Sequence, residues 1–242
     1  MKKLFLLTSC IFLSTVIFTQ AAEVNWVRIT GRWTVERDLH TSYMVQHKQK
    51  AYQWGYNPLI NANTIISGEV FDGYTEIEAE FTPLRPYQEG QYVMIPFAIE
   101  DYRNLYGVRL SGTANNLNKA TFIQSRTKDT TRPRSEKWNF EIAEHTSAKI
   151  DVSYNNPIRV RLVFTSDKTV ELLINGEKVM DYTFKNAVNS GRLGISSYHV
   201  SMKVDRYTIK KNNEVLLDDE FTEDTIKRFV VKGELKKKDD DE

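Results

Sequence analysis

Apolar residues recur at every second position through most of this 242-residue chain. The clearest case is KTVELLINGEKVMDYTF, residues 168–184, where Val170, Leu172 and Ile174 alternate ahead of Asn175-Gly176. A period of two is typical of a half-buried strand, and an Asn-Gly pair tolerates the positive φ angles of a type I′ turn. The segment therefore predicts a tight β-hairpin.

The same alternation predicts strands along the rest of the chain, and no stretch shows a helical stripe. In residues 74–81, three apolar side chains share one face, while Glu76, Glu78 and Glu80 share the other. A chain of many short strands separated by turn residues indicates an all-β fold, a two-sheet antiparallel sandwich or jelly roll. The predicted strands span 31–37, 41–46, 74–81, 91–99, 105–110, 120–125, 138–143, 157–165, the 168–184 hairpin, 190–198 and 203–209.

Residues 1–21 have the features of an export signal. Lys2 and Lys3 precede a mostly apolar run over 4–18, and small residues at 19–22 predict cleavage after Ala21 or Ala22. The apolar run is short for a membrane span, and hydroxyl-bearing residues interrupt it. The mature chain, residues 22–242, is therefore expected to be exported, either to a periplasm or to the cell surface and beyond.

Cys10 is the only cysteine. Leu7-Thr8-Ser9-Cys10 resembles a lipobox, which offers lipidation as an alternative, but only four apolar residues precede the cysteine. Cleavage at Ala21 or Ala22 would leave a mature chain without a disulfide. An exported protein without disulfides suits a bacterial envelope better than an animal extracellular matrix.

Charge is nearly balanced: removing Lys2 and Lys3 from the 33 basic residues leaves 31 against 32 acidic residues. This balance argues against a dedicated nucleic-acid binder. Residues 126–137 form a charged segment, predicted to be a solvated loop or a contact for an anionic glycan or protein face. The opposed charge blocks of 232–242 predict a disordered tail, with partner docking as the alternative.

Several short motifs occur in an informative order. These are Gly31-Arg32-Trp33-Thr34-Val35, FDGYTEIEAEF at 71–81, NLYGVRL at 104–110, VELLINGEKV at 170–179, and SGRLGISS followed by KVDRYTI at 190–209. Together they resemble the concanavalin A-like lectin and glucanase superfamily, which includes laminin G-like domains, over about residues 31–210. The resemblance implies a concanavalin-like jelly roll, a fold that hosts lectins, hydrolases and structural modules alike.

A C-terminal segment, 211–231, extends this resemblance. Leu217-Asp218-Asp219-Glu220-Phe221 resembles the D-x-F segment with which such domains usually begin. Within the implied fold, the segment either closes a sheet edge of its own chain or pairs with the edge of another subunit. The predicted domain therefore covers 22–231.

The resemblance also bears on catalysis. Glucanases of this superfamily place paired acids at alternate strand positions, which makes Glu76, Glu78 and Glu80 candidates. However, FDGYTEIEAEF resembles the strand that precedes the catalytic strand of the family. The strand expected to carry the acids is the one after residues 91–99, and it reads LYGVRL, with no acid. A solvated strand face and no catalytic residue are therefore expected. His40, His47, His145 and His199 form no recognisable ligand pattern.

Binding residues can be proposed more directly. Sugar rings stack on exposed aromatic side chains, and the candidates in or beside loops are Trp54, Tyr56, Tyr102, Trp138 and Tyr198. The resemblance further implies a calcium ion on Asp205, with Asp218 or Asp219 as a second carboxylate, although calcium needs six or more oxygens.

The sequence thus favours an exported, non-enzymatic binding module of the bacterial envelope that recognises carbohydrate or glycoconjugate. A structural component of an envelope assembly, such as a sheath or appendage, is the alternative, and a glycoside hydrolase comes third. The expected partner is a glycan or an envelope protein.

Overall fold

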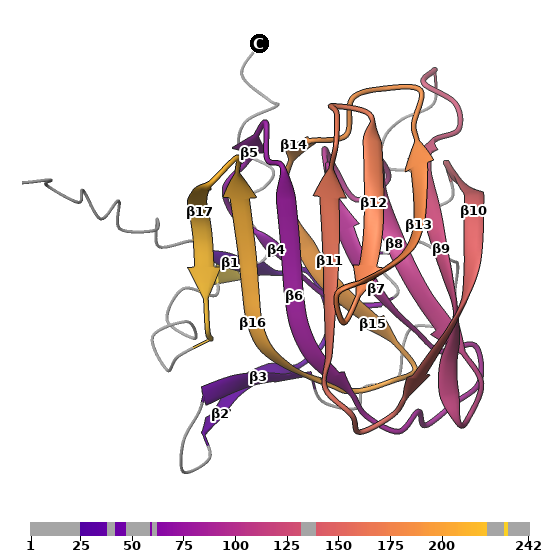
Figure 1. The fold of residues 1–242 in the computed structure, drawn as a ribbon, viewed down its shortest axis with the longest axis vertical. Helices are drawn as coiled ribbons and strands as arrows, with labels where there is room; N and C mark the ends of the chain where they lie inside the picture. Colours follow the sequence, from indigo (N-terminus) through magenta and orange to yellow (C-terminus); the bar gives the residue numbers. More distant parts are fainter. Residues whose placement is uncertain are drawn as a thin grey trace, which may run out of the picture.

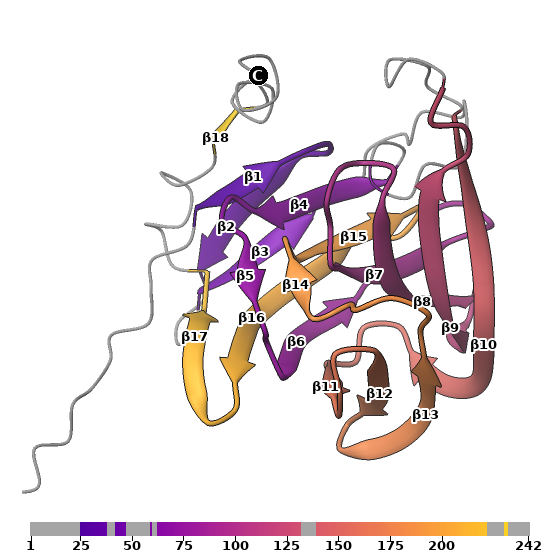
Figure 2. The ribbon, with the colours of Figure 1, turned by 90° about the horizontal axis from the view of Figure 1, so that it is seen from above.

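A computed structural model describes residues 25–37, 42–46, 59, 62–131, 139–221 and 230–231 of the chain. Within these ranges, two eight-stranded sheets pack face to face, as the two layers in Figures 1 and 2 show. All pairings within the sheets are antiparallel except for one short parallel pair. The all-β, two-sheet sandwich predicted from the sequence is therefore confirmed.

Sheet A has the strand order β10-β9-β8-β7-β15-β4-β1-β18. Its strands are β1 (Trp26–Arg28), β4 (Asn63–Ser67), β7 (Tyr92–Phe97), β8 (Leu105–Gly112), β9 (Asn116–Thr127), β10 (Phe140–Ser153), β15 (Gly194–Tyr198) and β18 (Val230–Val231).

Sheet B has the order β13-β12-β11-β6-β16-β3-β2, and β17 pairs with β16 beside that path. Its strands are β2 (Trp33–Arg37), β3 (Ser42–Gln46), β6 (Glu76–Pro83), β11 (Ile158–Phe164), β12 (Thr169–Ile174), β13 (Glu177–Thr183), β16 (Met202–Lys211) and β17 (Glu214–Asp219). A separate two-stranded pair joins β5 (Phe71–Asp72) to β14 (Ser190–Gly191).

Aromatic side chains fill much of the space between the sheets. Phe164 packs edge-on against Tyr74 and Phe97, with ring centroids 4.9 and 5.5 Å away. The buried Tyr74 hydroxyl donates to the Val188 carbonyl and accepts from the Ala98 amide. Burial raises the pKa of Tyr74 far above its ordinary value, so this hydroxyl stays neutral and serves as a polar tie across the core.

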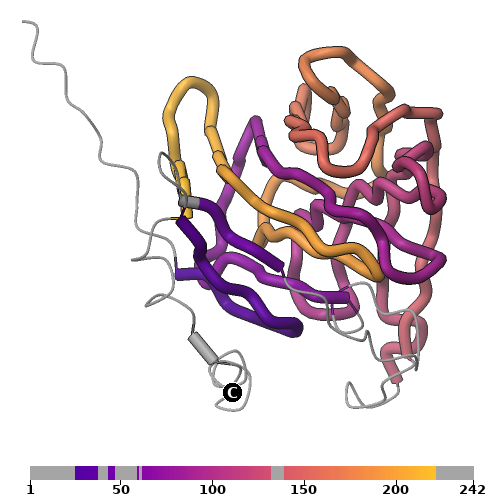
Figure 3. The backbone as a smooth tube through the Cα atoms, turned by 90° about the horizontal axis from the view of Figure 1, so that it is seen from below, coloured from indigo at the N-terminus to yellow at the C-terminus, as the bar shows by residue number. Residues whose placement is uncertain are grey.

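The two ends of the described chain meet at one side of the sandwich. The strand β17 lies beside β16, as the yellow hairpin of Figure 3 shows, and β18 pairs with β1, so the C-terminal segment borders both sheets. The Trp26 indole Nε1 donates to the buried Asp219 carboxylate at 2.8 Å, and the Phe221 amide donates to the same carboxylate at 2.8 Å. Of the two arrangements considered for residues 217–221, the structure shows pairing within the same chain.

Several segments differ from the expected boundaries. The strands β9 and β10 are much longer than the 120–125 and 138–143 predicted, and β1 and β4 were not predicted. The predicted export signal and the charged tail, 232–242, lie outside the described residues. Within the part of the chain that the structure describes, no helix has the length and apolar character needed to cross a membrane.

The turn between β12 and β13 gives a first prediction. Asn175 and Gly176 have φ angles of 52° and 88°, and a Cβ added at Gly176 would meet no atom within 4 Å. Replacing Gly176 with Val should therefore destabilise through the backbone rather than through a clash, by about 1–3 kcal/mol. Urea unfolding measures this cost. Glu177→Val, one residue along, is the control and should change stability by less than about 0.5 kcal/mol; equal stability for both variants would refute the turn assignment.

The contact between the chain ends gives a second prediction. Asp219→Ala removes the acceptor for both Trp26 Nε1 and the Phe221 amide, so it should cost roughly 1–3 kcal/mol in unfolding free energy. The matched control is Asp218→Ala on the same strand, which breaks the partly exposed ion pair to Arg206 and a 3.4 Å hydrogen bond from Thr208 Oγ1, and should cost about 0–1 kcal/mol. The reverse order of costs would show that the buried carboxylate does not hold the ends together.

Candidate functional site

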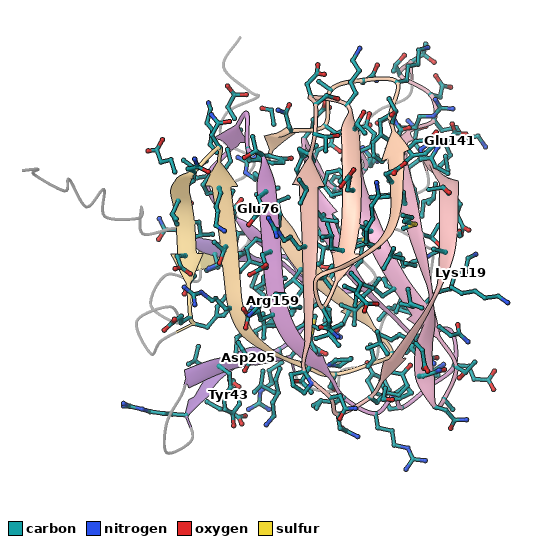
Figure 4. All side chains as sticks on the ribbon, in the orientation of Figure 1. Tyr43, Glu76, Lys119, Glu141, Arg159 and Asp205 are labelled. Atoms are coloured by element: carbon teal, nitrogen blue, oxygen red, sulfur yellow. The ribbon has the colours of Figure 1, made fainter. Side chains whose placement is uncertain are left out.

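The outer face of sheet B is a ladder of paired charges. The Glu76 carboxylate accepts from Arg161 Nη2 at 2.5 Å and from Lys210 Nζ at 2.7 Å, while Arg159 lies 2.9 Å from Glu80 (Figure 4). Burial acts to raise the pKa of Glu76, but the hydrogen bonds from Lys210 and Arg161 hold it below its ordinary value. A general acid needs a raised pKa, so Glu76 is arranged for ion pairing rather than for proton transfer.

The outer face of sheet A has a different composition. In β7, Val93, Ile95 and Phe97 point into the core, so Tyr92 and Met94 project from the opposite side of the strand. The strand register extends this face across the sheet. One row runs Tyr198, Tyr92, Ser111 and Lys119, and the next runs Thr64, Ser196, Met94, Arg109 and Thr121.

Three stacked rings lie at one end of this face. The half-buried rings of Tyr92 and Tyr198 have centroids 5.2 Å apart and an interplanar angle of 16°. Tyr198 also stacks with His199 at 3.8 Å, and the Arg109 guanidinium lies 5.9 Å from the Tyr92 ring centroid. Burial raises the pKa of Tyr92 well above its ordinary value, so the phenol remains neutral and able to donate a hydrogen bond.

Polar groups stand next to these rings. Arg109 Nη2 donates to the Glu144 carboxylate, and Lys119 Nζ lies 3.6 Å from the same group. The hydrogen bond from Arg109 is the main cause that lowers the pKa of Glu144, so its carboxylate is ionised at neutral pH. Among the described residues, the buried Arg109 Nε has no hydrogen-bond acceptor.

The hydroxyl and apolar side chains on this side of the sheet are buried, and Thr64, Ser196, Thr121 and Met94 have 0% relative exposure. Thr64 Oγ1 donates to Ser196 Oγ at 2.9 Å, and Thr121 Oγ1 and Ser147 Oγ are 3.0 Å apart. A second apolar cluster packs on this side of sheet A, separate from the main core; its buried members are Val27, Leu59, Ile66, Met94, Ile99, Leu105 and Ile123. The groups on this side of sheet A that reach solvent therefore include the half-buried Tyr92, Tyr198 and Arg109 and the exposed Lys119 and Glu144.

The structure brings two of the five predicted aromatic residues to this region. Tyr198 belongs to the ring stack, and Tyr102 packs against the second apolar cluster with the Arg103 guanidinium 4.3 Å from its ring centroid. Trp54, Tyr56 and Trp138 lie outside the described residues.

Tyr92, Arg109 and Glu144 were not predicted as site residues. The alternation of 91–99 and 105–110 could have assigned Tyr92 and Arg109 to a common outward face, because both alternate with apolar core residues. The bulged strand that carries Glu144 could not be aligned in this way.

The two aspartates predicted to hold calcium lie on adjacent strands of sheet B. Asp205 sits at the register shift in β16, and Asp218 is opposite Thr208, three residues or roughly 10 Å along that strand. Both Asp218 oxygens accept from Arg206, at 2.6 and 2.5 Å, and this contact lowers the pKa of Asp218. Asp218 is thus held in an ion pair, and no cluster of three His, Cys, Asp or Glu side chains occurs in the described ranges. Calcium binding at Asp205 stays a prediction.

Comparison with known proteins identifies the fold. No protein-family model matches the sequence, and no curated protein matches it. Among solved structures, the carbohydrate binding module CBM66 from Bacillus subtilis has a TM-score of 0.54 and 11% identity, with 79% of this chain and 98% of that one covered. The carbohydrate recognition domain of Emp46p, in a potassium-bound form, has a TM-score of 0.52 and 10% identity, with 77% and 88% covered.

A glycoside hydrolase family 16 protein from Bacteroides ovatus, solved with a mixed-linkage glucan product, is also similar, with a TM-score of 0.49, 10% identity and coverage of 76% and 94%. At sequence identities of 10–11%, these similarities are evidence of a shared fold alone. The chain therefore has the concanavalin A-like sandwich fold that these two carbohydrate-binding domains have.

Proposed function

We propose that this chain is an exported, non-enzymatic module that binds carbohydrate on the outer face of sheet A. The observation that carries the proposal is the Tyr92–Tyr198 ring pair beside the Arg109–Glu144 ion pair. Sugar recognition uses an aromatic surface for the CH groups of the ring and polar side chains for its hydroxyls. Both kinds of group occur here on adjacent strands.

Glu144 and Arg109 suit the polar part of this task. An ionised carboxylate accepts hydrogen bonds from sugar hydroxyls, and a guanidinium donates to ring and hydroxyl oxygens. Because Arg109 holds Glu144 in place, the two groups are positioned before a ligand arrives, which reduces the entropy lost on binding.

The fold comparison supports the ligand class. Two structures with TM-scores above 0.5 are described as a carbohydrate binding module and a carbohydrate recognition domain. The carry-over to this chain rests on fold-level analogy, and the aromatic and polar groups of sheet A supply the chemical reason for it.

The outward face of β8 supports the non-enzymatic part of the proposal. Its outward positions are Leu105, Gly107, Arg109 and Ser111, so the strand that the family resemblance marks for catalytic acids presents no carboxylate. Glycoside hydrolysis requires two carboxyl groups roughly 5–10 Å apart across the scissile bond. On sheet B, the glutamates of β6 are neutralised by arginine and lysine.

The site is tested by a glycan array followed by titration of any ligand found. Tyr198→Ala and Arg109→Gln should each weaken binding about tenfold or more, because they remove a ring contact or the group that positions Glu144. The matched control is Tyr43→Ala, a partly exposed tyrosine of sheet B whose ring contacts Lys203, and it should leave affinity unchanged. Thermal unfolding of each variant separates lost binding from lost folding.

The carbohydrate assignment would be overturned in favour of the assembly role if the chain bound no glycan on the array but captured an envelope protein in a native pull-down.

Enzymatic activity has its own test. The purified protein should release no reducing ends from β-glucans, and Glu78→Gln and Glu144→Gln should therefore change nothing in that assay. Measurable hydrolysis that disappears in either variant, with the fold intact by circular dichroism, would show that the protein is a hydrolase.

A further inference from the structure

Two lysines face each other directly on the outer side of sheet A. Lys119 of β9 is opposite Lys149 of β10 in the strand register. Both are exposed, and Figure 4 shows Lys119 extending away from the sheet. Directly opposed residues have Cβ atoms about 4.5–5.5 Å apart, so both ammonium groups can reach one anion between them.

Sheet B also carries a pair of directly opposed side chains with the same charge. Glu171 of β12 is opposite Asp181 of β13, and this pair would also be repulsive. Lys178 lies between them, with its Nζ 2.8 Å from Glu171 and 2.6 Å from Asp181. On sheet B, therefore, an internal counter-charge offsets the repulsion.

At Lys119 and Lys149 the internal counter-charge is incomplete. Glu144 accepts from Arg109 and also pairs with Lys119 at 3.6 Å, so one carboxylate serves two cations. Asp151, two residues after Lys149, accepts from Asn116 Nδ2 at 2.8 Å, a neutral donor that leaves its charge in place. Within the described ranges Lys149 forms no ion pair, so the three cations Arg109, Lys119 and Lys149 stand against the two carboxylates Glu144 and Asp151.

We propose that Lys119 and Lys149 form a subsite for the acidic group of an anionic glycan, a carboxylate or a sulfate ester on the sugar. The inference rests on the proposed carbohydrate-binding function and specifies its ligand class. Tyr92, Ser111 and Lys119 lie in one row on consecutive strands, so Tyr92 and Lys119 are roughly 10 Å apart, with Tyr198 and Lys149 one strand further out on either side. One sugar unit would lie on the tyrosines while the acidic group of another meets the two ammonium groups.

The experiment measures binding of four soluble polymers to the full mature chain. Polygalacturonate carries carboxylates and dextran sulfate carries sulfates, while galactan and dextran are neutral. The variants are Lys119→Gln, Lys149→Gln and the double variant. Lys203→Gln, a lysine of sheet B that contacts Tyr43, is the matched control. Each titration is repeated at 50 mM and 500 mM NaCl, because ion pairing at exposed groups weakens with salt.

We expect at least one acidic polymer to bind at least tenfold more tightly than its neutral counterpart at low salt. The double variant should lose that preference, Lys203→Gln should keep it, and the preferred polymer identifies carboxylate or sulfate as the acidic group. The double variant should also unfold at the same or a higher temperature, since it removes a repulsion.

Other outcomes separate this inference from the proposed function. Equal binding of neutral and acidic polymers, lost in Tyr198→Ala but not in the lysine variants, would overturn the anionic subsite and leave carbohydrate binding standing. Binding to no polymer would overturn both. Lysine-dependent binding to anionic lipid vesicles but to no polymer would assign the pair to a membrane surface instead.

Discussion

The two sheets share a single apolar interior, and this constraint governs where every other side chain can go. In β6, the side chains of Ile77, Ala79 and Phe81 are buried between the sheets. The side chains that alternate with them therefore face outward. The same holds for β7, where burial of Val93 and Ile95 places Tyr92 on the outer surface of sheet A. Function is thus confined to two outer faces and the loops that join them.

Those two faces are chemically unlike. Sheet B carries glutamates on one strand and arginines or lysines on both neighbours, an arrangement that satisfies its own charges and offers little to a ligand. Sheet A carries stacked tyrosines beside the Arg109–Glu144 ion pair. A surface that places aromatic rings beside charged groups is better suited to sugar recognition than one that carries charge pairs alone.

Alternation was sufficient to predict the fold class and most of the central strands, because burial of one face leaves a period-two record in the sequence. It was insufficient for β1, which has only three residues, and for β10, where two register shifts interrupt the period. The candidate site was harder to predict from the sequence than the fold. Tyr198 could be proposed as an aromatic beside a loop, but its neighbour Tyr92 comes from a strand about 100 residues earlier, and only the strand order unites them.

The hydrogen bond between Trp26 and Asp219 spans 193 residues of sequence. The first strand therefore cannot acquire its last neighbours until nearly the whole chain is available, and contacts of such long range form slowly because the intervening loop must first be closed. In a partly synthesised chain, the Trp26 side chain would lack these partners. If the protein is exported as proposed, this late closure would keep the chain incompletely folded while it crosses the membrane, and the sandwich would be completed only at its destination.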